Sequence, residues 1–167
     1  MKTSFKRFSV LAFIVIMSLT ISLVPVNASP PVRTVEGVFT TQAFSGPDCA
    51  SPVDFCSVGT VTGDISGDVA VELQTAEFTT DENGTPILIY STNITITSRN
   101  GTISGISNGT INLVTSELNA VFELNSGTGY YRNRRGTLTV SGTSNPQTGE
   151  EILPFVGTLS VVPRSQR

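Results

Sequence analysis

The chain has 167 residues, of which 38% are hydrophobic, and it contains no histidine. Without histidine the chain has neither a Ser-His-Asp nor a Cys-His catalytic arrangement, and with two cysteines it has too few ligands for the common zinc sites. Thirteen acidic residues outnumber ten basic ones, and this balance argues against the basic surface that binding to nucleic acid requires.

The N-terminal segment is typical of a secretory signal peptide. Three basic residues precede an apolar run at 8–24, and a small-residue "VNA" site ends at Ala28. We expect a signal peptide at 1–28 and one domain at 29–167, with a retained membrane anchor as the alternative. After cleavage the chain would carry seven arginines against thirteen acidic residues, a net charge of −6. The expected location is therefore extracellular or periplasmic, without further contact with the membrane.

The two cysteines lie close together in "GPDCASPVDFCSVG". Exported chains form disulfides, so Cys49 and Cys56 are expected to pair and close a surface loop. A redox or metal-binding pair is the alternative, but the spacing is not C-x-x-C and no histidine accompanies it. No metal site and no cofactor are predicted, since the acidic residues near loops lack the spacing of a calcium loop.

The rest of the chain is rich in strand formers interrupted by turn signals. The turn signals are "DENGTP" at 81–86, "RNG" at 99–101, "SNG" at 107–109 and "SNPQTGE" at 144–150. Short connections predict antiparallel neighbours. The expected strands are 34–44, 58–66, 68–80, 86–98, 102–106, 109–115, 118–125, 136–142 and 153–162.

Apolar and polar residues alternate along most of these segments. In 118–125, for example, Leu118 and Phe122 share one parity, whereas Glu123 has the other, and Glu72 is likewise on the polar side of its strand. One apolar face per strand predicts a single antiparallel eight-stranded β-barrel, with a β-sandwich as the alternative. The expected interior is almost wholly aliphatic and phenyl, without a buried carboxylate, and is either filled or holds a small cavity.

Glycine-spaced motifs carry a family resemblance over most of the mature chain. "CASPVDFCSVGTVTGDISGDVAVEL" at 49–73, "SGTGYYRNRRGTLTVSGT" at 126–143 and "FVGTLSV" at 155–161 resemble exported proteins of the allene oxide cyclase barrel-like class, to which dirigent proteins are more distantly related. The resemblance implies an eight-stranded antiparallel barrel. It implies no site residues, because the polar pocket residues of these enzymes have no matching positions here.

The stretch "GYYRNRR" contains a basic cluster. Its residues Tyr130, Tyr131, Arg132, Arg134 and Arg135 are candidate ligand-binding residues, because guanidinium groups bind carboxylates and phosphates in pairs of hydrogen bonds. The alternative is a solvated turn, with the two tyrosines packed over a barrel end. If this cluster binds ligands, the protein is expected to be an extracellular module that binds glycans or other anions.

Tyr90 has the clearest polar group among the residues expected inside the barrel. It is a candidate ligand-binding residue, and its alternative is a core tyrosine whose hydroxyl binds the backbone. The first hypothesis is a secreted, non-catalytic barrel that either binds a small apolar ligand or acts as an extracellular structural module. The second hypothesis is an isomerase or cyclase, related in kind to allene oxide cyclase or dirigent proteins, that acts on an apolar substrate by proximity and shape. A dry cavity with Tyr90 and one carboxylate facing inward would favour this enzyme. The sequence does not predict an oligomeric state.

Overall fold

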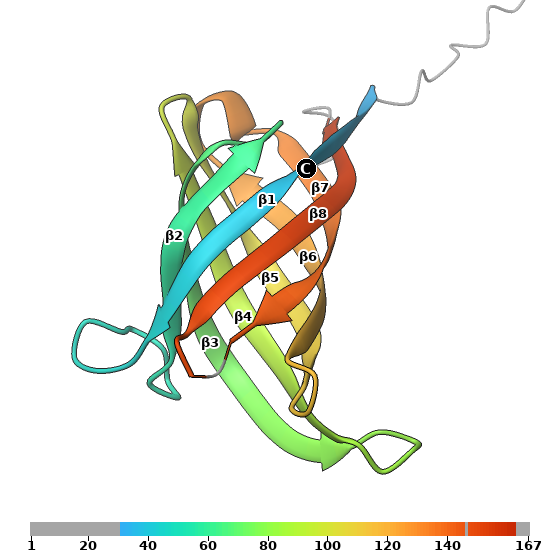
Figure 1. Ribbon diagram of the computed structural model, residues 1–167. Helices are drawn as coiled ribbons and strands as arrows, with labels where there is room; N and C mark the ends of the chain where they lie inside the picture. Colours follow the sequence, from blue (N-terminus) through green and yellow to red (C-terminus); the bar gives the residue numbers. More distant parts are fainter. Residues whose placement is uncertain (1–30, 146, 163–167) are drawn as a thin grey trace, which may run out of the picture.

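The computed structural model describes residues 31–145 and 147–162, which form one closed barrel of antiparallel strands (Figure 1). The expected signal peptide lies outside these residues. No helix within the described ranges is long and apolar enough to cross a membrane. The elements are β1 (Val32–Phe44), β2 (Cys56–Gly63), β3 (Gly67–Thr80), β4 (Pro86–Ser98), β5 (Gly101–Asn112), β6 (Glu117–Gly127), a short 3-10 helix η1 (Gly129–Tyr131), β7 (Arg134–Ser144) and β8 (Glu150–Val161).

The strands follow one another around the barrel in chain order, and β1 pairs with β8 to close it. Every pairing is antiparallel, as the short connections predict. Closure leaves no unpaired edge among the described strands. The predicted eight-stranded barrel is confirmed, and the sandwich alternative is wrong.

The predicted break between two strands at 107–109 is wrong. The expected segments 102–106 and 109–115 belong largely to the single strand β5, which runs through the predicted "SNG" turn at 107–109. Ser107 and Gly109 face the interior of the barrel, and Gly109 lies opposite Tyr90 in the β4–β5 register. A Cβ atom at Gly109 would lie 2.6 Å from the Tyr90 hydroxyl. Small residues here leave room for a large neighbour, and they do not mark a turn.

The two ends of the barrel differ. The end that we call the loop end is formed by the β1–β2, β3–β4, β5–β6 and β7–β8 connections, and in Figure 1 the β3–β4 hairpin extends beyond its neighbours there. The opposite end, which we call the terminal end, holds the start of β1 and the end of β8, where Val32 pairs with Ser160. The predicted turns at 81–86, 99–101 and 144–150 all connect strands.

Three phenylalanines divide the interior. The ring of Phe39 lies 5.4 Å from that of Phe122 and 4.9 Å from that of Phe155, between ring centroids. Toward the terminal end the barrel is filled by buried side chains, which include Val35, Val61, Ile65, Ile96, Ile103, Leu124, Leu138 and Leu159. The sequence prediction of a filled interior therefore holds for this half of the barrel.

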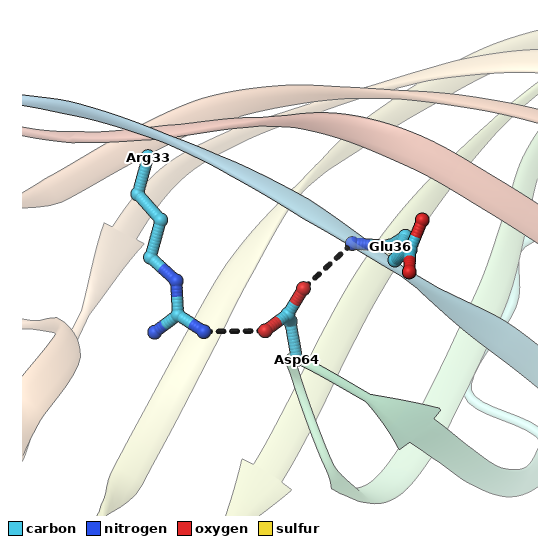
Figure 2. Close-up of polar contacts among 3 residues, drawn as sticks. All are labelled: Arg33, Glu36 and Asp64. Carbon is cyan, nitrogen blue, oxygen red and sulfur yellow. Dashed lines mark hydrogen bonds and ion pairs between the residues drawn. The ribbon is translucent and has the colours of Figure 1, made fainter.

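A polar contact fixes the β2–β3 turn at the terminal end (Figure 2). Arg33 on β1 forms an ion pair with Oδ1 of Asp64. The backbone N–H of Glu36 donates to Oδ2 of Asp64 at 3.1 Å, and the Asp64 N–H donates to the Glu36 carbonyl at 2.9 Å. Asp64 therefore joins the turn to β1 through both its side chain and its backbone.

Candidate functional site

A cavity of about 310 Å³ lies between the loop end and the layer formed by Phe39, Phe122 and Phe155. Phe39 and Phe122 border it on the inner side, and aliphatic side chains from β3 to β6 and β8 form much of its wall. The volume is at the lower end of the range for pockets that bind small molecules. The half of the barrel near the loop end is therefore hollow, whereas the other half is packed.

A β-bulge in β3 lets residues on both sides of it point into the cavity. Before the bulge, Val69, Val71 and Leu73 line the cavity, and the register with β4 then shifts between Leu73 and Thr75. The extra residue changes the inward parity, so that Ala76 and Phe78 also line it. Phe78 is 75% exposed, which places it at the mouth.

The loop at 45–55 forms another part of the mouth, to which it contributes Val53 and Phe55. The predicted disulfide is confirmed: Cys49 and Cys56 are bonded, with their Cα atoms 5.6 Å apart. The loop is also attached to β3, because the Leu73 N–H donates to the Phe55 carbonyl at 3.0 Å and the Ser51 hydroxyl donates to the Leu73 carbonyl. These links hold the mouth in a defined shape.

A buried carboxylate lines the cavity wall, contrary to the sequence prediction. Glu151 on β8 is 8% exposed, and its Oε2 accepts hydrogen bonds from the hydroxyls of Thr41 at 2.6 Å and Ser57 at 2.7 Å. Its Oε1 accepts from the Ser144 hydroxyl at 3.3 Å. Hydroxyl donors replace the water that a buried carboxylate loses, which explains why an acidic residue is tolerated here.

The wall formed by β4 and β5 carries hydroxyl groups among its aliphatic side chains. Tyr90, Thr92 and Ser107 are buried and line the cavity. Burial, together with the negative charge of Glu151, raises the pKa of the Tyr90 hydroxyl far above its usual value. Neither Thr92 Oγ1 nor Ser107 Oγ has a hydrogen-bond partner among the described residues. This wall therefore presents hydroxyl groups that are available to a bound molecule.

The other predicted ligand-binding residues lie at the terminal end, away from the cavity. Tyr131 is buried in the core, whereas Tyr130 is 51% exposed and packs edge-on against it with ring centroids 5.2 Å apart. The Arg134 guanidinium lies 3.8 Å from the Tyr130 ring centroid. Tyr130, Arg132 and Arg134 border a shallow depression, and Arg135 is exposed beside it on β7. A role of this cluster in anion binding stays a prediction.

Sequence reasoning missed Glu151 although the signal was present. The predicted strand began at Leu153, and 144–150 was assigned to a turn. Leu153 and Phe155 face inward, so the same alternation extended by two residues places Glu151 inside. Among the described residues, no group of three or more cysteine or acidic side chains could hold a metal ion.

Comparisons with known proteins do not assign a family. No protein-family model matches the chain, and no curated protein does. A match among solved structures is a nonspecific heme-binding cyclase that catalyses a [4 + 2] cycloaddition during neoabyssomicin biosynthesis. It has a TM-score of 0.43 and 15% identity, over 82% of this chain and 70% of the cyclase chain. At this TM-score the likeness indicates nothing about activity. The function proposed below therefore rests on the cavity.

Proposed function

We propose that this barrel binds a small, mainly apolar molecule in the cavity at its loop end. The main support for this proposal is the cavity of 310 Å³. Its walls are aliphatic and aromatic apart from Glu151 and the hydroxyls of its lining. Transfer of apolar surface from water into such a site is favourable by about 25 cal/mol per Å². A mouth held by a disulfide and by hydrogen bonds to β3 reduces the entropy cost of binding.

We also propose that the protein acts outside the cytoplasm. The Cys49–Cys56 disulfide supports this location, because such bonds persist in oxidising compartments.

The binding proposal is tested on protein purified from its own host. Native mass spectrometry should show a retained small molecule that is released on denaturation. Val71→Phe, which directs a ring into the cavity, should abolish this retention. Ala70→Phe is the matched control, because the neighbouring side chain on β3 is exposed on the outside of the barrel. Equal retention in the two variants would contradict a site inside the barrel.

A second candidate function is an isomerase or cyclase that acts on the bound molecule. The observation that favours it is the inward carboxylate of Glu151, whose charge acts on the Tyr90 hydroxyl in the same cavity. In this function Glu151 accepts a proton from one position of the substrate and returns it at another, which regenerates the carboxylate. The Tyr90 hydroxyl keeps its proton and donates a hydrogen bond to the negative charge that develops on the substrate. Shape and proximity supply the rest of the catalysis.

The enzyme proposal is tested with apolar extracts of the host, followed by mass spectrometry for components that the protein consumes. Wild-type protein should convert a component that Glu151→Gln and Tyr90→Phe still bind but leave unchanged. If both variants convert it as fast as the wild type, or if the wild type converts nothing, the enzyme proposal is wrong.

A further inference from the structure

We infer that the cavity selects an uncharged molecule with an oxygen-containing polar group, such as a ketone or an alcohol, and that it rejects carboxylates. The inference rests on the proposed binding function and names the ligand class for the same cavity. It is carried by two facing walls, one with unpaired hydroxyls and one with a carboxylate.

The first wall contains an adjacent pair of hydroxyls. Thr92 on β4 and Ser107 on β5 are direct partners in the register, and both line the cavity. They are 5% and 0% exposed, and neither hydroxyl has a hydrogen-bond partner among the described residues. Buried hydroxyls in proteins are nearly always hydrogen-bonded, so a partner is expected from within the cavity.

Tyr90 adds a third hydroxyl to this wall. It precedes Thr92 by two residues on β4 and therefore faces the same side of the strand. Burial keeps this hydroxyl protonated over the physiological range, so it is available as a donor. A carbonyl oxygen accepts two hydrogen bonds, and a ligand hydroxyl both donates and accepts. Either group fits a wall of hydroxyls better than a pure hydrocarbon does.

The second wall determines the charge of the ligand. Glu151 lies on β8, which is four strands from β4 in the closed ring and is thus on the opposite side. Its described partners are hydroxyls, and no cation among the described residues forms an ion pair with it. A ligand carboxylate would bring a second negative charge into a site largely shielded from water, where repulsion between like charges is strong.

Three probes of nearly equal shape test the inference: ethylbenzene, acetophenone and benzoate. Their affinities are measured from amide chemical shifts of the isotope-labelled protein. Replacing Thr92 and Ser107 (T92V/S107A) should reduce the preference for acetophenone over ethylbenzene about tenfold. The matched control is T95V/S104A, which changes a cross-strand pair of the same two strands on the outer face, where Thr95 and Ser104 hydrogen-bond to each other at 3.2 Å. If T92V/S107A does not fold, the single variant T92V, in which valine has nearly the shape of threonine, is used in the same measurement.

Benzoate tests the role of the carboxylate. It should not bind the wild type, and it should bind Glu151→Gln. An unchanged acetophenone preference in T92V/S107A, or benzoate that binds the wild type as tightly as acetophenone does, overturns the inference while the binding function stands. If none of the three probes shifts any amide of the wild type, the proposed binding function fails as well.

Discussion

Ser57 on β2 donates a 2.7 Å hydrogen bond to Glu151 on β8, a residue 94 positions later in the chain. Thr41 on β1, the strand between them, donates to the same carboxylate oxygen at 2.6 Å. Three strands around the closure of the barrel therefore share one buried anion. This arrangement makes the carboxylate both a structural element of the closure and a chemical group of the cavity.

Removal of the two hydroxyls should destabilise the barrel, because it leaves the carboxylate buried without its shortest hydrogen bonds. We expect T41V/S57A to lower the free energy of unfolding by about 3 kcal/mol, since hydrogen bonds to charged groups contribute more than neutral ones. Urea denaturation measures the change. Addition of Glu151→Leu should recover much of the loss, because an apolar replacement removes the buried charge. If T41V/S57A is as stable as the wild type, the hydroxyls do not support the carboxylate.

Tyr90 should make the protein sensitive to alkaline pH. Its pKa is raised by burial and by Glu151 in the folded state, whereas an unfolded tyrosine ionises near pH 10. The unfolded state therefore loses this proton first, and stability falls as the pH rises above about 10. Tyr90→Phe should show a smaller loss over the same range in urea denaturation. If the free energy of unfolding falls equally steeply with pH in both proteins, the pKa of Tyr90 is not raised.

Gly109 should tolerate no side chain. An added Cβ would lie 2.6 Å from the Tyr90 hydroxyl and 2.7 Å from the Asn119 carbonyl oxygen. We expect Gly109→Ala to cost about 1–3 kcal/mol of stability, as overpacking does in other cores. Tyr90→Phe should relieve only part of this cost, because the backbone oxygen of Asn119 remains in place. A double-mutant cycle in urea measures the coupling, and no coupling would mean that the hydroxyl does not limit the space.

The disulfide should stabilise both the fold and the mouth of the cavity. Its cysteines are seven positions apart, and closure of so short a loop contributes about 2 kcal/mol in the chain-entropy model. We expect C49S/C56S to lose this amount in thermal or urea unfolding. It should also bind acetophenone less tightly than the wild type, because Val53 and Phe55 lose their anchor. Unchanged affinity would indicate that the loop does not shape the site.

The barrel could be predicted because alternation along a strand reports directly on burial. Leu118, Ala120, Phe122 and Leu124 on β6 are all buried, and the residues between them are exposed. Such a pattern needs no knowledge of distant contacts. The "SNG" sequence misled the prediction, because small residues mark turns as well as places where a neighbouring side chain needs space. Only the β4–β5 pairing shows that Gly109 gives room to Tyr90.

The cavity was harder to predict than the barrel. Tyr90 was identified because it stands out on an apolar face, whereas Glu151 lies at the start of a strand beside a turn signal. Its hydroxyl partners come from β1, β2 and β7, so their convergence depends on barrel closure. The β-bulge after Leu73 also changes the inward parity of β3, and simple alternation does not anticipate it. The site is built from long-range pairings that one sequence does not display.

The most direct test of the central claim is an NMR measurement of nuclear Overhauser effects between acetophenone and the wild-type protein. Binding in the cavity predicts contacts from the probe to the Tyr90 ring and to the side chains of Phe122 and Leu118, which line it. Contacts confined to Tyr130 and its neighbours at the terminal end, or the absence of any contact with cavity residues at saturating probe, would contradict the account.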